Sequence, residues 1–324
     1  MRTLFRLIWL TFTAIVVRDR LLLWQRTAPA FRNPVLLLSY PIRGPLTLWL
    51  SRNVGRKIPT IPSELDYQVV EVEEAKLHIY SPLNPNQPQP ALIWIHGGGY
   101  VAGLAEAEHE VAGRYAEVIS GVVVSVDYRL APEHPFPAAL DDCFAALRWL
   151  IDNHEELKVD LNRIAIGGMS AGGGLAASLA AKAHDAGIAI KHQHLLYPML
   201  DPISAVVADT SHRGLNWNRS SNEYAWQAYL GHHPGIPELR EYAAPAIRKD
   251  LSGLAAAWIG VGESDLFFEE NTRYAKRLNE AGVACDLVTI PGMYHAADRI
   301  DPNHPEVRRF IELSESALAR ALFA

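Results

Sequence analysis

Short, wholly apolar segments alternate with helix-forming segments along most of the chain beyond residue 65. The apolar segments predict strands that are buried on both faces, and they lie at residues 91–95, 122–126, 163–167, 188–196, 255–261 and 285–290. The intervening segments predict helices at residues 106–120, 138–153, 173–186, 269–281 and 306–322. Residues 67–72 and 76–80 predict a β-hairpin ahead of this series. Regular alternation of buried strands and helices predicts an α/β fold, with a mostly parallel sheet and helices on both faces.

Two regions fall outside this alternation. Residues 1–65 are apolar, aromatic and basic, and prolines divide them into segments that allow only short helices. Residues 199–250 show no strand–helix alternation and are rich in Trp, Tyr, Asn and His. Because folds of this class bind ligands at the carboxyl edge of the sheet, we expect the second region to cover that edge. The predicted division is an N-terminal helical cap segment, a first core part, a cap insertion and a second core part, at residues 1–65, 66–200, 201–240 and 241–324.

The N-terminal segment at residues 4–17 is mostly apolar, and arginines flank its uncharged part. As a helix it would extend about 21 Å, which is short of the ~30 Å hydrocarbon core of a membrane. Arg18-Asp19-Arg20 follows where a signal peptide would have a small-residue cleavage site. The sequence predicts an interfacial helix that contacts a membrane peripherally, or one that packs on the protein itself. We expect a cytoplasmic protein with this peripheral contact as its membrane association.

The net charge argues against a nucleic-acid partner, and the positions of the cysteines favour packing roles. The 30 Lys and Arg residues and 36 Asp and Glu residues give a net charge of −6, with no basic block that could follow a phosphate backbone. We therefore expect no nucleic-acid partner. Cys143 and Cys285 lie far apart and are interpreted as buried packing residues. A dimer is the oligomeric state to consider, and the sequence does not decide it.

Residues 168–172, Gly-Met-Ser-Ala-Gly, join a predicted buried strand to a predicted helix of small apolar residues. Strand, Gly-x-Ser-x-Gly and helix is the arrangement of a nucleophile elbow, in which a sharp turn exposes the serine hydroxyl above the sheet. Ser170 is therefore the candidate nucleophile. The structural alternative is an ordinary Gly/Ser-rich turn at the end of a strand.

A serine nucleophile needs a base and an acid that orients the base. Asp265 follows the apolar strand at residues 255–261, and His295 follows the strand at residues 285–290. The carboxyl ends of adjacent parallel strands can bring such groups together, in the chain order Ser, Asp, His. The alternatives are that Asp265 is a turn residue and that His295 is one of several loop histidines.

Residues 96–99, His-Gly-Gly-Gly, follow another buried strand. Consecutive glycines expose backbone N–H groups, as an oxyanion hole requires. Gly97, Gly99 and Ala102 also fit a dinucleotide-binding fingerprint, with Asp127 as the ribose-binding acid. That alternative gives no reason for His96 or for the residues Tyr-Arg-Leu-Ala-Pro-Glu that follow Asp127.

Together, the motifs at residues 96–99, 127–133 and 168–173 resemble the hormone-sensitive-lipase-like branch of the α/β-hydrolase esterases, from about residue 65 to the C-terminus. The resemblance implies an α/β-hydrolase fold with a helical cap, made from an N-terminal segment and an insertion. It implies Ser170 as nucleophile, Asp265 as orienting acid and His295 as base. It also implies an oxyanion hole formed by the N–H groups of Gly98, Gly99 and Ala171.

The chain departs from that family at two places. Met169 stands where the family usually has an acidic residue, and Leu266-Phe267-Phe268 is more apolar than the usual sequence after the acid. Neither change removes a member of the triad. Both leave the substrate preference and the pH behaviour open.

We therefore expect a serine carboxylic ester hydrolase that forms an acyl-enzyme on small esters with short-to-medium acyl chains, without a cofactor or metal. Tyr100, Trp217 and Phe267 are the candidate substrate-binding residues. His192 and His194 share one face of a strand, but without a third ligand we interpret them as packing residues. Two functional alternatives stay open: a non-catalytic small-molecule binding protein on the same fold, and an amidase or lactonase with the same triad.

Overall fold

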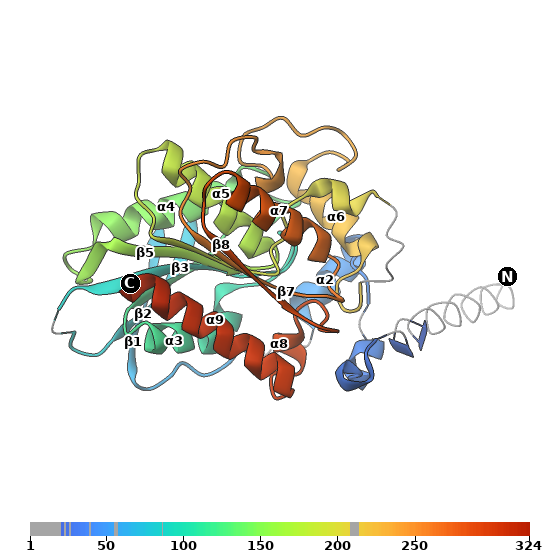
Figure 1. Cartoon of the computed structure of the whole chain (residues 1–324), viewed down its shortest axis with the longest axis horizontal. Coiled ribbons are helices and arrows are strands. Elements are labelled where there is room, and N and C mark those ends of the chain that lie inside the picture. Colours follow the sequence, from blue (N-terminus) through green and yellow to red (C-terminus); the bar gives the residue numbers. More distant parts are fainter. Residues whose placement is uncertain are drawn as a thin grey trace, which may run out of the picture.

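A computed structural model describes residues 21–22, 24–25, 27–38, 40–54, 58–85, 87–207 and 214–324. The segment at residues 4–17, for which we expected a membrane contact, lies outside the described residues. The centre of the structure is a twisted eight-stranded sheet (Figure 1). Its strands, in chain order, are β1 (Leu65–Val72), β2 (Ala75–Pro82), β3 (Gln89–Ile95), β4 (Val122–Asp127), β5 (Val159–Met169), β6 (His192–Leu196), β7 (Ala257–Gly262) and β8 (Cys285–Ile290).

The spatial order of the strands is β1-β2-β4-β3-β5-β6-β7-β8. β1 and β2 form the predicted hairpin, and β2 is also antiparallel to β4. The remaining neighbours from β4 to β8 are parallel. The prediction of a mostly parallel α/β sheet is therefore confirmed, and the carboxyl ends of its parallel strands lie at one edge.

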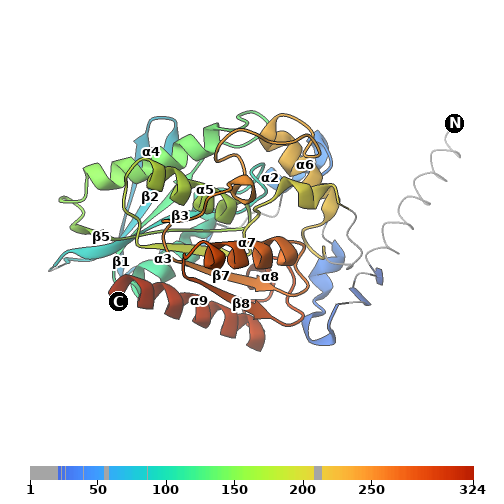
Figure 2. The same ribbon diagram turned by 45° about the horizontal axis from the view of Figure 1, so that its top comes forward.

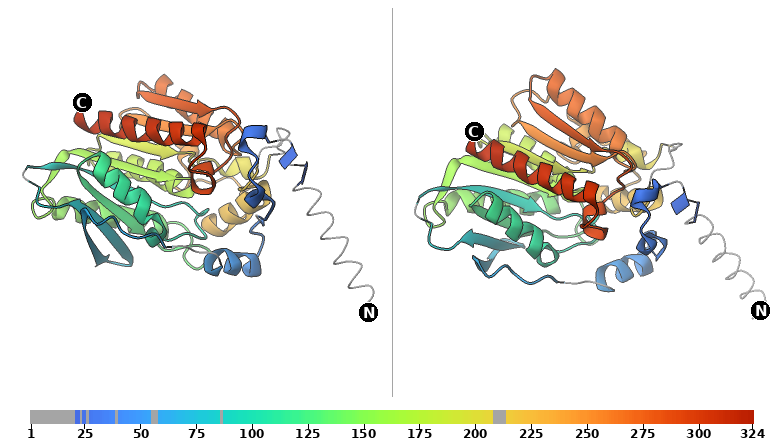
Figure 3. Two further views of the ribbon diagram at one scale, coloured as in Figure 1. Left: turned by 90° about the horizontal axis from the view of Figure 1, so that it is seen from below. Right: turned by 60° about the horizontal axis from the view of Figure 1, so that its bottom comes forward.

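Helices cover both faces of the sheet (Figures 1 and 2). One face carries α4 (Ala138–Asp152), α5 (Ala171–Asp185) and α7 (Phe268–Glu280). The other carries α3 (His109–Val118) and α9 (Pro305–Phe323), and α9 runs along the sheet as Figure 3 shows. The short helix α8 (Ala297–Ile300) connects β8 to α9.

The side chains of β3 show why this strand is apolar along its whole length. Ile93 and Ile95 belong to the core under α4 and α5, whereas Leu92 and Trp94 belong to the core under α3 and α9. All four side chains are completely buried. Because successive residues of a strand point to opposite faces, a strand between two layers of helices must be apolar at every position.

One predicted strand is shorter than expected. We predicted a strand at residues 188–196, but β6 begins only at His192, where pairing with Ala165 of β5 starts. Gly187 ends the preceding helix with a φ of +73°, and the residues after it carry the chain back to the sheet. Ile188 and Ile190 pack against the core from this connection, so they are apolar without being paired in the sheet.

Two helices, α2 (Pro45–Asn53) and α6 (Arg219–Leu230), lie at the carboxyl edge of the sheet, where we expected a cap (Figures 1 and 2). They come from two distant parts of the sequence, and we refer to them with their flanking segments as the cap. The backbone N–H of Ile42 donates to Ser221 Oγ at 3.0 Å, and this bond ties the N-terminal segment to α6. Within the described part of the chain, no helix combines the length and the apolar character needed to cross a membrane.

Candidate active site

Ser170 lies between the end of β5 and the start of α5, in a strained backbone conformation with φ 54° and ψ −120°. The glycines on either side are required by close backbone contacts. A Cβ on Gly172 would lie 2.1 Å from the Ile95 carbonyl oxygen, and one on Gly168 would lie 2.5 Å from the Gly172 backbone. The turn is therefore possible only with glycine at both positions, and it has the geometry of a nucleophile elbow.

The structure brings Ser170, His295 and Asp265 together from three separate loops. His295 Nε2 lies 3.0 Å from Ser170 Oγ, and His295 Nδ1 lies 2.8 Å from Asp265 Oδ2. All three residues are buried, and Asp265 is completely so. The other carboxylate oxygen, Asp265 Oδ1, accepts a hydrogen bond from the Phe267 N–H at 2.8 Å. This is the nucleophile–base–acid arrangement that acyl transfer requires.

Aromatic rings enclose the His295 imidazole. The rings of Tyr197 and Phe267 meet it edge-on, with centroid distances of 4.9 and 5.1 Å. Trp217 lies further out, at 6.4 Å. Such rings exclude water from the imidazole–carboxylate pair and hold the imidazole plane. Of the three candidate substrate-binding residues, Trp217 and Phe267 therefore lie beside His295.

Gly98, Gly99 and Ala171 are the residues whose backbone N–H groups we expect in the oxyanion hole. Gly98 and Gly99 have φ values of +120° and +63°, and Ala171 is the first residue of α5. The N–H groups of these residues donate to no acceptor within the part of the chain that the structure describes. Unpaired amides beside a serine hydroxyl, one of them at a helix N-terminus, suit a developing oxyanion. A Cβ on Gly99 would lie 2.4 Å from the Trp217 ring, so this tryptophan lies directly against the glycine loop.

Residues 127 and 128, at the end of β4, contact the segment around the glycine loop. Asp127 Oδ1 accepts from the Ala105 N–H at 3.0 Å, and the Tyr128 hydroxyl donates to the His96 carbonyl at 3.1 Å. The Tyr128 ring also stacks on the His96 ring, at a centroid distance of 4.2 Å. Asp127 binds the Ala105 backbone and Tyr128 packs on His96, so both motif residues have structural roles that require no dinucleotide.

The N-terminal segment contributes a further support for this loop. Arg52, in the last turn of α2, donates from Nε to the Val101 carbonyl at 2.7 Å and from Nη2 to the Ala131 carbonyl at 2.8 Å. It also binds both carboxylate oxygens of Glu133, at 2.8 and 2.9 Å. The cap is therefore fastened directly to the loop that carries Gly98 and Gly99.

Tyr100 and two cap aromatics pack against one another. The Tyr100 ring stacks on Tyr229 at 4.0 Å and contacts Trp226 at 5.3 Å, and its hydroxyl donates to the Met199 carbonyl. All three aromatic side chains are buried. Their contacts fix α6 on the core, whereas Trp217 is the cap aromatic placed above the glycine loop.

Sequence reasoning missed Tyr197 and Asp298. The buried Tyr197 hydroxyl donates to Asp298 Oδ1 at 2.8 Å and lies 3.7 Å from Met169 Sδ. Burial raises the pKa of the Asp298 carboxyl, while the Tyr197 hydrogen bond and the Arg299 guanidinium oppose that rise. Asp298 lies in α8, shortly after His295, and Tyr197 connects it to Met169, the residue before Ser170. The only sequence signal was an acidic residue close behind His295.

His192 and His194 pack as expected. His194 stacks on Trp258 at 4.9 Å, and its Nε2 lies 2.8 Å from Ser314 Oγ. Burial lowers the pKa of His192 to about 4. Across the described residues, no group of three or more His, Cys, Asp or Glu side chains is arranged to hold a metal ion.

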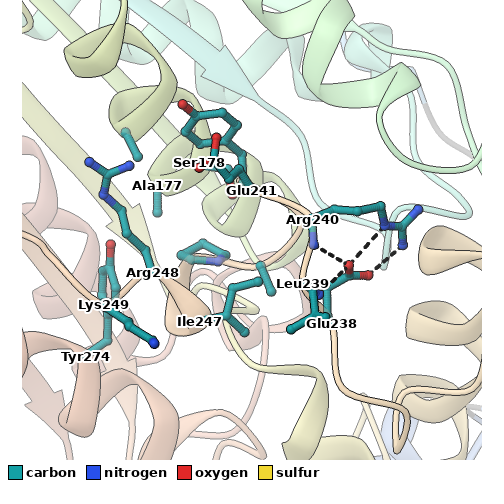
Figure 4. A pocket seen from close by; sticks show the side chains of 14 residues that line it. Ala177, Ser178, Glu238, Leu239, Arg240, Glu241, Ile247, Arg248, Lys249 and Tyr274 are labelled. Atoms are coloured by element: carbon teal, nitrogen blue, oxygen red, sulfur yellow. Dashed lines mark hydrogen bonds and ion pairs between the residues drawn. The ribbon is translucent and has the colours of Figure 1, made fainter.

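A separate cavity of about 270 Å³ lies between α5, α7 and residues 238–249 (Figure 4). Its lining includes Ser178, Leu239 and Tyr274, and none of the three residues of the proposed triad. Arg240 at its edge is already paired with Glu238 (Figure 4). This cavity is distinct from the site around Ser170.

The family model described as the alpha/beta hydrolase fold matches residues 92–299, which is more than half of the chain. The chain belongs to this family. Carboxylesterase NlhH of Mycobacterium tuberculosis is 35% identical over 257 residues, which cover 76% of this chain and 79% of that protein. The ethyl acetate hydrolase of Pseudomonas putida is 30% identical and covers 73% of this chain and 76% of its own.

Solved structures agree with this assignment. A bacterial heroin esterase superposes with a TM-score of 0.75 and 34% identity, covering 80% of this chain and 85% of its own. The protein is therefore a carboxylesterase of the serine hydrolase class, in the hormone-sensitive-lipase-like branch that its motifs resemble. This finding replaces the alternative of a non-catalytic binding protein.

Proposed function

We propose that Ser170 is the nucleophile of this esterase, His295 its general base and Asp265 the acid that orients the base. In the first step the Ser170 Oγ proton passes to His295 Nε2 as Oγ bonds to the ester carbonyl carbon. The carbonyl oxygen becomes an oxyanion, which the N–H groups of Gly98, Gly99 and Ala171 stabilise. His295 then protonates the departing alcohol oxygen, and an acyl-enzyme is left.

Water completes the cycle. A water molecule takes the place of the alcohol, gives a proton to His295 Nε2 and bonds to the acyl carbon. The same three amides stabilise the second oxyanion. The bond to Ser170 Oγ then breaks, His295 returns the proton to Oγ, and the carboxylic acid leaves.

The observation that carries this proposal is the continuous contact from Ser170 Oγ to His295 to Asp265, at 3.0 and 2.8 Å. We expect Ser170→Ala to abolish hydrolysis of a p-nitrophenyl ester while circular dichroism and the melting temperature stay near those of the wild type. A fluorophosphonate should label Ser170, as peptide mass spectrometry would show. Label on another serine, or most of the activity retained by the alanine variant, would overturn the assignment.

We further propose small esters with short-to-medium acyl chains as the substrates. The support is the position of two bulky rings, Trp217 above Gly99 and the buried Phe267 beside His295, which we expect to restrict the space for a long acyl chain. An amide or a lactone would pass through the same acyl-enzyme. Parallel assays with an ester, an amide and a lactone of the same acyl group distinguish these substrates, and we expect the ester to be hydrolysed fastest.

We also propose a cytoplasmic protein that contacts membranes peripherally through residues 4–17. The supporting observation on the described chain is an apolar face of α2, on which Leu46 is 70% exposed and Trp49 57% exposed. Trp at such a position favours the membrane interface. High salt or carbonate should release the protein from membranes. Release by detergent alone would contradict a peripheral contact.

A further inference from the structure

Residues 214–218 of the cap insertion, which we call the strap, contact both halves of the site. Trp217 lies over Gly99 of the glycine loop. One residue earlier, Asn216 Nδ2 donates a hydrogen bond to the backbone carbonyl of His295 at 3.1 Å. A single short segment therefore contacts the proposed oxyanion hole and the proposed base.

The His295 carbonyl lies at a point where regular structure does not provide a donor. Ala296 has a φ of +55°, and α8 starts only at Ala297. The first backbone bonds at the start of α8 go from Arg299 to the Ala296 carbonyl and from Asp301 to the Ala297 carbonyl. The carbonyl of His295 is thus left for the Asn216 amide, which fixes the backbone at the residue that carries the imidazole.

Two residues of the strap have a positive φ, and this backbone conformation places the Asn216 amide near His295. Asn216 has a φ of +68°, a conformation that asparagine tolerates better than most residues, and Gly214 has a φ of +117°. On the other side, the Asn218 side chain accepts from the Ser221 N–H at 3.0 Å and so caps α6. The strap is therefore fixed to α6 at its C-terminal end, and the Asn216 side chain donates to the His295 backbone.

We propose that Asn216 is a positioning residue for His295. The imidazole is held by Asp265 at Nδ1 and by the rings of Tyr197 and Phe267 at its sides. Asn216 holds the remaining part, the backbone from which the side chain extends. Because the strap belongs to the cap insertion, this bond links the cap directly to the residue that carries the base. The proposal rests on the role of His295 as base.

The test compares Asn216→Gly and Asn216→Asp with a matched control. Glycine keeps the positive φ without the amide, and aspartate keeps the shape without the donor. For the control, Asn153 Nδ2 makes the same kind of bond to the Trp149 carbonyl at 2.8 Å, at the end of α4, so we use Asn153→Gly. With p-nitrophenyl butyrate, we expect kcat of both Asn216 variants to fall at least about tenfold, because small misplacement of a catalytic group is costly. Their KM should change less than about twofold, and Asn153→Gly should keep the wild-type kcat.

Three results would overturn the proposal. The first is a kcat within twofold of the wild type, and the second is a higher KM at unchanged kcat. The third is a loss of kcat that is accompanied by a lower melting temperature. The second would make Asn216 a substrate contact, and the third would make it a structural residue. A fluorophosphonate reaction with the wild type and with His295→Ala is run alongside. Fast labelling of Ser170 in the wild type, lost in His295→Ala, keeps the proposed function intact whatever the Asn216 variants do.

Discussion

The buried Asp265 carboxylate has a hydrogen-bond partner at each of its two oxygens. One of its oxygens faces His295 Nδ1 and the other faces the Phe267 N–H, both at 2.8 Å. Each partner is a donor, so the site needs a group with two acceptor oxygens. An asparagine has the same shape but presents an NH₂ group on one side, which meets a donor or forces the imidazole into the other tautomer.

We therefore expect Asp265→Asn to lower kcat at least about a hundredfold with little change in the melting temperature. The matched controls are Glu263→Gln and Glu269→Gln, which remove the neighbouring carboxylates on either side of Asp265 in the sequence. Steady-state hydrolysis of p-nitrophenyl butyrate measures all three. If one of the glutamine variants were inactive and Asp265→Asn were active, that glutamate would be the acid.

At the scale of elements, the first turn of α7 joins the acid loop to the nucleophile elbow. Glu270 Oε1 accepts from the Leu200 N–H at 2.7 Å, and Asn271 Nδ2 donates to the Pro198 carbonyl at 2.7 Å. The same segment reaches the elbow, because the Met199 N–H donates to the Ser170 carbonyl at 2.9 Å. α7 thus fixes the loop after β6, from which the cap insertion departs.

Glu270 makes this connection sensitive to pH. Burial raises the pKa of its carboxyl from 4.5 to about 8, and the Asp201 carboxylate adds to the rise. Between these two values the unfolded chain has released the proton and the folded chain retains it. The free energy of unfolding therefore decreases as pH rises through this window, and this decrease is complete above about pH 8.

We expect Glu270→Gln to remove this dependence. Relative to the wild type, the variant should gain more than about 1 kcal/mol of stability between pH 5 and pH 8.5, since each unit of pKa shift corresponds to about 1.4 kcal/mol. Urea unfolding at the two pH values measures the difference. Glu280→Gln, at an exposed position on the same helix, is the control and should show no such gain. Parallel pH curves for Glu270→Gln and the wild type would contradict the prediction.

At the scale of the whole molecule, the cap combines two segments that are distant in the sequence. Arg52 fastens the N-terminal segment to the glycine loop, and Trp217 brings the insertion over Gly99. Ile42 and Ser221 join the two segments to each other. We expect such an enclosure to limit the depth of the acyl site, so that each buried acyl methylene contributes about 0.8 kcal/mol only until the walls are reached.

We therefore expect kcat/KM to rise from acetyl to butyryl or hexanoyl esters and then to fall. The measurement is a series of p-nitrophenyl esters from two to sixteen acyl carbons. Trp217→Ala should move the maximum to longer chains, whereas Leu239→Ala, at an exposed residue of the separate cavity, should leave it in place. A wild-type maximum at twelve carbons or more would mean an open groove.

The sequence by itself determined the sheet, the order of its helices and the fold family. Strands between two helical layers must be apolar throughout, as β3 is, and such segments are visible in the sequence. The glycines around Ser170 were equally visible, because a Cβ at Gly168 or Gly172 would meet backbone atoms. These signals are local, since each depends on the requirements of one strand or one turn.

The tertiary structure decided which residues meet across the cap and the loops. Nothing in the sequence distinguishes Trp217, above the glycine loop, from Trp226, which packs against Tyr100. The contact from Asn216 to His295 joins residues 79 positions apart, and that from Tyr197 to Asp298 joins residues 101 apart. Such contacts have no sequence period, because irregular loops bring the partners together only after the sheet has placed both ends of each loop.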